Sequence, residues 1–427
     1  MKRDRWHNTQ KAVLVLSLWL FCSLFGCQTA RQESSPVGIE QAQGQELALP
    51  AEKKDIRLCL DLFHAYFESD IRSFLDQISA RVQGCNVAYE SLPREEPERS
   101  AALTRLRTEI MSGKGPDIFV CSCPFGSADR VFPYPKQAAK NRLFLCLDDY
   151  ISEAEEMDWN YLFSPVMEAG RTEEGQQLLP LTYEFSLRML DASASVPDVE
   201  RPMTWMQMVN SQTPSVQSAA RRGLLGDVFG ELGDYSRDIP AFTEEEFLAR
   251  AMEYMELEDN GEGEQVHWYD GWLTNGGSPL NLSEGGQSFF MLPTYNVSGG
   301  ITANITAFAA ISRNTEYPAE CFQVLDYLLS QNAQQNDNIY ALLGGWPVHR
   351  KVGSEEVPWR SRTMSKANFE EFSTVREQIN AVKFYTPLDK AIWDISALWH
   401  SSEQTPEALE EIVHTQYTKM EMMLAES

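Results

Sequence analysis

Residues 106–120 read LRTEIMSGKGPDIFV, a stretch whose pattern predicts the end of a helix, a turn and a strand. Gly113 is a typical helix stop, and the Gly115-Pro116 pair predicts a turn. The next four residues, DIFV, then predict a short buried strand. The helix before them has apolar residues at the spacing of one helical face, namely Leu103, Leu106 and Ile110.

The same alternation of strand and helix precedes this stretch. Residues 56–63 and 86–91 are short runs that predict strands. Between them, Ser69 is a good N-cap for a helix that Gly84 would end. The apolar stripe of this helix is Ile71, Phe74, Leu75, Ile78 and Val82. A strand-helix-strand-helix-strand order implies parallel pairing with helices on the faces of the sheet, so the predicted fold class is α/β.

Later segments continue the pattern less regularly. Residues 178–190 are strand-like, and residues 301–311 are small, apolar and β-prone. A helix with Cys321, Phe322, Leu325, Leu328 and Leu329 on one face follows. The last helix has Thr405 as its cap and Pro406 in its first turn. Its stripe is Leu409, Ile412, Val413, Tyr417, Met420 and Leu424. No internal repeat or heptad array is visible, and we expect two α/β lobes.

Composition excludes some functions. The chain has 427 residues, 43% of them hydrophobic, which is ample for a large core, and its net charge is -26. The first 26 residues hold four bases against one acid, so the remainder carries about -29. A surface this negative repels phosphate backbones, so we expect no nucleic-acid partner.

The N-terminal region has the features of an export signal. A basic start is followed by an apolar run at residues 12–25, which is too short to span a bilayer comfortably. It ends in Leu24-Phe25-Gly26-Cys27, which resembles a bacterial lipobox. We therefore expect residues 1–26 to be a lipoprotein signal peptide and Cys27 to carry the lipid, palmitate included, at the extracytoplasmic face of the cell membrane. An ordinary secretory signal or a poor membrane anchor is the alternative. Residues 27–54 predict a flexible tether.

Six cysteines follow Cys27, and their state stays open at this point. Cys59 and Cys121 lie in apolar strand-like runs, where cysteine often acts as a small buried hydrophobe. Disulfides are the alternative in an exported protein. A zinc site is a third possibility, but Cys121-Ser122-Cys123 lacks a second ligand pair at usable spacing.

The common catalytic motifs are absent from the sequence. There is no GxSxG, no Walker A loop, no GxGxxG after a strand, and none of the six histidines forms HExxH. Residues 256–264 have acids at alternate positions, as in a calcium loop, but His267 stands where the closing Glu is needed. We predict a protein that is not an enzyme, with no metal and no cofactor, although a carboxylate pair assembled from distant segments would leave no local motif.

Several segments resemble the extracellular solute-binding proteins of bacterial ABC importers, in particular the sugar-binding, maltose-type family. Residues 106–120 resemble the family's helix, turn and strand near the start of the first lobe. Further segments resemble the family in the same order along residues 55–427: Leu179 to Glu184 (LPLTYE), Pro202 to Trp205 (PMTW), Gly300 to Ser312 (GITANITAFAAIS), Gly345 to Val348 (GWPV) and Thr405 to Glu426.

The resemblance implies a bilobal type II periplasmic-binding-protein-like fold, in which two α/β lobes joined by a hinge close on a small solute. Residues 55–183 and 306–343 would form the first lobe. Residues 184–305 and 344–427 would form the second. The protein would act as a monomer and deliver its solute to the permease subunits of an ABC transporter.

The resemblance also suggests ligand-binding residues, position by position. Glu184 falls where maltose-type proteins place a ligand-binding Glu, and a hinge salt bridge is its alternative role. Loop residues after the first strand and aromatic or acidic residues of the second lobe are further candidates: His64, Tyr66, Trp268, Asp270, Trp272, Trp346 and Trp393. For each Trp, packing in the core is the alternative. Residues 121–125, CSCPF, depart from the family pattern, which weakens a maltose-like specificity.

Aromatic faces beside carboxylates suit a carbohydrate or oligosaccharide, which is the predicted ligand. Polyamine or another cationic solute is the alternative. A lipid-tethered glycan hydrolase and a sensor lipoprotein are alternatives of other classes.

Overall fold

The computed structural model describes residues 54–63, 68–82, 85–192, 196–221, 223–259, 268–272, 288–336, 339, 342–359 and 363–427. The predicted signal peptide, nearly all of the predicted tether, Cys27, His64 and Tyr66 lie outside these residues. Chain contacts separate residues 52–427 as one compact unit from the residues before it. Within the described part, no helix is long and apolar enough to cross a bilayer.

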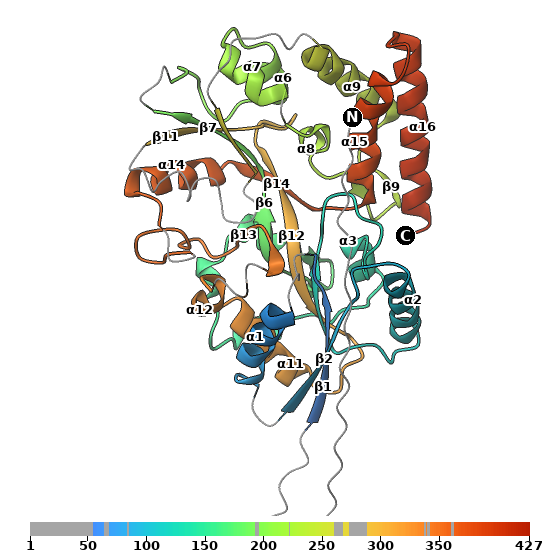
Figure 1. Ribbon diagram of the computed structural model, residues 1–427, viewed down its shortest axis with the longest axis vertical. Coiled ribbons are helices and arrows are strands. Elements are labelled where there is room, and N and C mark those ends of the chain that lie inside the picture. The colour runs from blue at the N-terminus through green and yellow to red at the C-terminus, as the bar shows by residue number, and fades with distance from the viewer. Residues whose placement is uncertain are drawn as a thin grey trace, which may run out of the picture. The chain divides into compact units, whose positions relative to one another are not determined.

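A seven-stranded sheet forms the centre of this unit (Figure 1), with the strand order β13-β6-β12-β3-β1-β2 and β14 paired to β12. Its strands are β1 (Lys54–Asp61), β2 (Cys85–Ser91), β3 (Ile118–Ser122), β6 (Leu179–Glu184), β12 (Ile301–Ile311), β13 (Trp346–Pro347) and β14 (Ile379–Phe384). The pairs β1–β2 and β1–β3 are parallel, as predicted, with Leu58 opposite both Tyr89 and Ile118. The long strand β12 runs antiparallel to β3 and β6 and parallel to β14.

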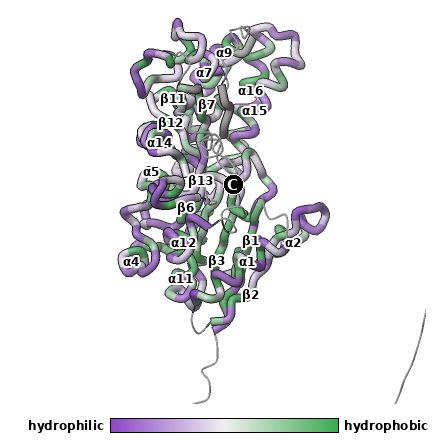
Figure 2. The backbone as a smooth tube through the Cα atoms, turned by 60° about the vertical axis from the view of Figure 1, so that its left-hand side comes forward, coloured by the Kyte–Doolittle hydropathy of each residue, from purple (hydrophilic) through white to green (hydrophobic). Residues whose placement is uncertain are grey.

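The sheet is covered on both faces because its crossovers run in opposite directions. The β1-α1-β2 step goes one way along the sheet and β2-α2-β3 goes back, so right-handed crossovers place α1 (Glu68–Ser79) and α2 (Glu98–Met111) on opposite faces. Figure 1 shows this arrangement, with α11 (Pro318–Leu328) near α1. Every residue of β3 and β6 is buried, as expected for strands covered on both sides. Figure 2 shows hydrophobic stretches along the central strands and hydrophilic ones around them.

A second, three-stranded sheet has the order β10-β7-β11 and is antiparallel. It consists of β7 (Ser186–Asp191), β10 (Trp268–Trp272) and β11 (Phe289–Pro293). Only Phe185 separates β6 from β7, so the chain passes directly from the large sheet to the small one. The predicted lobe boundaries stay a prediction. The structure adds that β13 and β14, assigned by sequence to the second lobe, pair with β6 and β12 of the large sheet.

Helices near the C-terminus pack against the segment that precedes β12. We call α8 (Leu225–Phe229), α9 (Glu244–Asp259), α15 (Pro387–His400) and α16 (Pro406–Ala425) the helical cluster, because α15 contacts α8 and α16, and α16 contacts α9. The predicted last helix is confirmed: the Thr405 side chain accepts a hydrogen bond from the Ala408 N–H. Leu409, Val413, Met420 and Leu424 are its buried stripe.

The remaining elements are short or peripheral. They are α3 (Pro135–Lys140), α4 (Asp148–Ser152), η1 (Trp159–Tyr161), α5 (Ser164–Glu168), β4 (Arg171–Thr172), β5 (Gly175–Gln176), α6 (Trp205–Val209), α7 (Pro214–Arg221), β8 (Gly233–Asp234), β9 (Ile239–Pro240), α12 (Gln331–Gln334) and α14 (Lys366–Arg376).

The six cysteines after Cys27 are all free thiols. Cys59 and Cys121 are buried in β1 and β3, which confirms the interpretation of these two as small core hydrophobes. Cys123 and Cys321 are buried as well. Among the described residues, no group of three or more His, Cys, Asp or Glu side chains could hold a metal ion.

Candidate ligand cleft

A cavity lies between the strand ends of the large sheet and the helical cluster. It has a volume of about 360 Å³ and is lined by Phe125, Glu184, Leu224, Tyr385 and Trp393. We call it the aromatic cavity. Phe125 follows β3, Glu184 ends β6, Tyr385 follows β14, Leu224 precedes α8, and Trp393 is on α15. Residues that lie up to 268 positions apart in the chain therefore meet at one site.

A second cavity of about 200 Å³ shares three of these residues, Phe125, Glu184 and Tyr385. We call it the strand-end cavity, because its other lining residues belong to strands of the large sheet or lie close to the end of one. They include Phe63, Ser122, Cys123, Thr306 and Gly345. Ligands of open α/β sheets bind at the carboxyl ends of the parallel strands, which is where β1 and β3 place Phe63 and Ser122.

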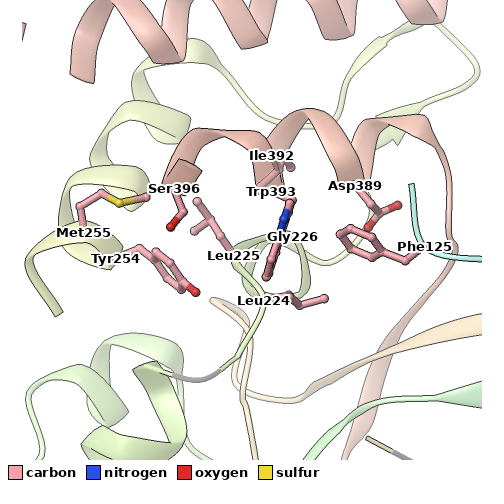
Figure 3. Close-up of a pocket in the computed structure, with 10 residues that line it drawn as sticks. All are labelled: Phe125, Leu224, Leu225, Gly226, Tyr254, Met255, Asp389, Ile392, Trp393 and Ser396. Atoms are coloured by element: carbon pink, nitrogen blue, oxygen red, sulfur yellow. The ribbon is translucent and has the colours of Figure 1, made fainter. Parts of the chain in front are cut away.

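A third, smaller cavity of about 50 Å³ lies against α15 (Figure 3). That helix supplies Asp389, Ile392, Trp393 and Ser396, while Phe125 approaches from the loop after β3. The approach is close: the next residue, Gly126, has φ +63°, and a Cβ there would lie 2.6 Å from Cβ of Lys390. A glycine is therefore needed where this loop meets α15.

The Phe125 ring stands at a steep angle to each of the two other rings around the aromatic cavity. The Phe125 ring lies 5.4 Å from the Tyr385 ring at 75°, and 5.9 Å from the Trp393 ring at 81°. Phe125 and Trp393 remain 38% and 51% exposed. Exposed aromatic residues that gather around a cavity are typical of a binding site rather than of a core.

Glu184 is the acidic group of this site. Its side chain is only 6% exposed, and burial raises its pKa to about 7. A hydrogen bond with Tyr385 lowers the pKa, the Asp227 carboxylate raises it, and the Lys383 ammonium lowers it. Near neutral pH this carboxyl is therefore poised between its protonated and ionised forms.

A buried cluster of charged residues lies next to the site. Lys383 forms a close ion pair with Asp389, and its Nζ lies 3.8 Å from Oδ1 of Asp227. Asn304 of β12 donates a hydrogen bond of 3.0 Å to the same Asp227 oxygen. Burial raises the pKa of Asp227 to about 6. The cluster ties β14, α15, α8 and β12 together around the aromatic cavity.

A second buried cluster holds the loop after β3. The Asp61 carboxylate accepts hydrogen bonds from Arg99 at 2.9 Å and from Arg130 at 3.0 Å. It also accepts one from the Val131 N–H at 2.9 Å. Arg99 also pairs with Asp129, so two carboxylates balance the two guanidinium groups, and neither group lines the aromatic or the strand-end cavity.

The structure brings together two of the residues suggested by sequence, Glu184 and Trp393, on the aromatic cavity. Trp346 lies elsewhere. It is 0% exposed, packs 4.8 Å from Trp359 and 4.9 Å from Phe372 between ring centroids, and lines none of the three cavities. This placement favours the alternative role, packing in the core.

For the remaining suggested residues, the side chain or the whole residue lies outside the described part of the chain. Strand β10 contains Trp268, Asp270 and Trp272 and pairs with β7 along its length, but these side chains lie outside the described part. His64 and Tyr66 also lie outside it. Their neighbour Phe63 lines the strand-end cavity.

Sequence reasoning missed Leu224 and Tyr385 as cavity residues, and it quoted Phe125 only as part of a departure from the family pattern. Tyr385 directly precedes the N-cap of α15, and Leu224 is the N-cap residue of α8. Cap positions identify a helix start but not what the neighbouring side chains face. No local signal in the sequence would have found these residues.

Cys123 is the one thiol that lines the aromatic or the strand-end cavity among the described residues. Burial raises its pKa well above the usual range for a thiol. Because the thiolate is the nucleophile, a buried and protonated Cys123 is poorly suited to nucleophilic catalysis.

No protein-family model and no curated protein sequence matches the chain. Solved structures do match. The chain is similar to the extracellular solute-binding protein family 1 from Alicyclobacillus acidocaldarius, with a TM-score of 0.56 and 13% identity, over 88% of this chain and 99% of that one. The chain is also similar to the sugar-binding protein MalE from Xanthomonas citri, with a TM-score of 0.57 and 13% identity, over 87% of this chain and 98% of that one. A third similar structure is a periplasmic oligogalacturonide-binding protein from Yersinia enterocolitica, with a TM-score of 0.54 and 12% identity, over 87% of this chain and 99% of that one.

At these identities the similarity shows the fold. The chain has the two-lobed α/β fold of the extracellular solute-binding proteins, as predicted from its sequence. Designed esterases also share this fold, so the fold does not by itself exclude catalysis.

Proposed function

We propose that this chain is an extracytoplasmic solute-binding protein, which captures a small solute in the cleft and presents it to the permease of an ABC importer. The observation that carries the proposal is the aromatic cavity. Its lining comes from the strand ends of the large sheet on one side and from the helical cluster on the other. A ligand that contacts both sides would favour the closed arrangement of the two parts.

The lining supports binding rather than hydrolysis. A glycosidase needs two carboxyl groups that flank the scissile bond. Among the described residues, Glu184 is the single carboxyl that lines the aromatic or the strand-end cavity. Asp389, on the smaller cavity, is already engaged by Lys383 and by the Thr386 N–H. A sensor lipoprotein would share the same capture step and differ in its partner.

The proposed ligand classes are those that the resemblance and the residues suggest. A pyranose can stack its apolar face on Trp393 while Glu184 accepts hydrogen bonds from hydroxyl groups. A cation can be held by the aromatic rings and the same carboxylate. Lipid attachment at Cys27 would keep the protein at the extracytoplasmic membrane surface, and mass spectrometry of the protein's N-terminal peptide tests this part of the proposal.

Calorimetry and small-angle scattering test the capture function. The purified protein is titrated with neutral mono- and oligosaccharides, polyamines and quaternary ammonium compounds. We expect one class to bind with micromolar affinity, about -8 kcal/mol, and to reduce the radius of gyration. A folded protein that binds no member of the panels and keeps the same scattering profile with all of them would contradict the proposal. Co-purification with permease subunits distinguishes import from sensing.

A further inference from the structure

The ring geometry of the aromatic cavity differs from a stacking platform. Sugar rings are flat enough to lie on one aromatic face. Here the Phe125 ring meets the Tyr385 ring at 75° and the Trp393 ring at 81°, so the three rings do not form one flat platform. Leu224 closes a further side with alkyl groups. A compact, rounded group fits such walls better than a flat one.

The polar inventory of the lining is small. Around the aromatic cavity, the described side chains that can hydrogen-bond are the Glu184 carboxyl, the Tyr385 hydroxyl and the Trp393 indole N–H. Glu184 and Tyr385 already hydrogen-bond to each other. A sugar carries a hydroxyl on almost every carbon, and buried hydroxyls without partners weaken binding. The volume of about 360 Å³ also lies at the low end for ligand sites, so a small group suffices to fill this cavity.

The charges around the cavity favour a cation. Lys383 faces three carboxyl groups: Asp389, which it contacts, Asp227 at 3.8 Å, and Glu184 of the cavity wall. No Lys, Arg or His among the described residues lines either the aromatic or the strand-end cavity. The Lys383 ammonium lies 5.1 Å from the centre of the Tyr385 ring, but it is paired with Asp389, so the described lining itself offers an anionic ligand no cation. The net charge of -26 adds long-range attraction for cations.

We propose that the aromatic cavity binds an alkylated ammonium group, seated among the rings of Phe125, Tyr385 and Trp393 and balanced by the Glu184 carboxylate. The assignment rests on the proposed capture function and names its substrate class. A primary ammonium has three N–H donors that point in different directions, whereas the acceptors of the described lining side chains are confined to Glu184 and Tyr385, which already bond to each other. A methylated ammonium has no N–H donor to satisfy and is held by aromatic rings through cation–π attraction.

The test compares ligands that differ only in charge. Choline and its carbon analogue 3,3-dimethyl-1-butanol have nearly the same shape, and the analogue lacks the positive charge. Both are titrated into the purified protein by calorimetry, beside tetramethylammonium, spermidine and maltose. We expect choline and tetramethylammonium to bind, and the neutral analogue to bind at least about tenfold more weakly, because it gains neither cation–π nor carboxylate attraction.

Variants locate the binding site. Trp393→Ala is expected to weaken choline binding about tenfold by removing one aromatic wall. Leu398→Ala is the matched control, because Leu398 is an exposed apolar residue on the same helix that lines none of the three cavities. It should change the affinity less than twofold. Far-ultraviolet circular dichroism verifies that both variants are folded.

The outcomes separate this inference from the proposed function. If maltose binds and choline does not, the cation assignment is wrong and the capture function stands. If spermidine binds and choline does not, the assignment to an alkylated ammonium is wrong and the capture function again stands. Equal affinity for choline and its neutral analogue, or an unchanged affinity in Trp393→Ala, also overturns the assignment. If no member of the panels binds the folded protein, both proposals fail.

Discussion

Glu184→Gln should make the ligand-free protein more stable at alkaline pH and leave it nearly unchanged at acidic pH. Burial raises the pKa of Glu184 from 4.5 to about 7 in the folded protein. Between these two values the folded state keeps a proton that the unfolded state releases, so stability falls as pH rises. A glutamine has almost the same shape, can accept the hydrogen bond from Tyr385, and does not ionise.

The size of the effect follows from linkage. With a folded pKa of about 7, the ionisable carboxyl costs about 3 kcal/mol at pH 8 and about 1 kcal/mol at pH 5, relative to a group with an unshifted pKa. The gain in unfolding free energy from Glu184→Gln should therefore be about 2.5 kcal/mol larger at pH 8 than at pH 5. Other groups titrate in both proteins and cancel in the difference, apart from their coupling to Glu184.

Urea denaturation at the two pH values measures this difference, with the slope of each transition used to verify that unfolding remains two-state. Glu411→Gln is the control, since it removes an exposed carboxyl on α16 and should give the same change at both pH values within about 0.5 kcal/mol. A Glu184→Gln variant with the same stability change at pH 5 and pH 8 would refute the reasoning. It would mean that Glu184 is ionised in the folded protein throughout this range.

Two further predictions concern the same region, and a third concerns the core around Trp346. Choline affinity should fall about tenfold from pH 8 to pH 6, because Glu184, with a pKa of about 7, loses its negative charge over that interval. Calorimetry at the two pH values measures the affinity, and equal affinities would contradict a charge contribution from this carboxyl. Lys383→Met should cost about 3 to 5 kcal/mol of unfolding free energy, since it leaves Asp389 and Asp227 buried without their cation. A loss below about 1 kcal/mol in urea denaturation would show that the protein does not depend on this cluster for its stability. Trp346→Ala should cost a similar 3 to 5 kcal/mol through the cavity it leaves, and the folded variant should keep its ligand affinity in calorimetry; a selective loss of affinity would return Trp346 to the list of ligand contacts.

The two buried ion clusters fix the segments that carry the walls of the aromatic cavity. Asp61 with its two arginines fixes the loop that carries Phe125, and Lys383 with its aspartates fixes the start of α15 and the end of β14. Breaking a buried pair is costly, so each cluster restrains the backbone near one wall of the cavity. The aromatic walls are therefore positioned by polar contacts that lie outside the lining of the aromatic and the strand-end cavities.

Local sequence pattern was sufficient for much of the fold. The strand-helix alternation up to Val120 and the last helix from Thr405 were predictable because burial on one face imposes a period that the residues display. Glu184 was suggested by the resemblance of its LPLTYE context, and the structure places it at the end of β6, where it lines the aromatic cavity. Trp393 likewise lies on a helix beside the cavity.

Only the tertiary structure decided which side chains converge. Trp346 and Trp393 are both tryptophans in apolar surroundings, yet one is sealed between Trp359 and Phe372 and the other is half exposed at the cavity. Phe125 and Tyr385 meet because β3 and β14 both pair with β12, a long-range contact that leaves no trace in either local sequence. Periodicity reports whether a residue faces a core or solvent. Which distant residue stands opposite depends on strand pairing and helix packing, and these are set by the whole chain.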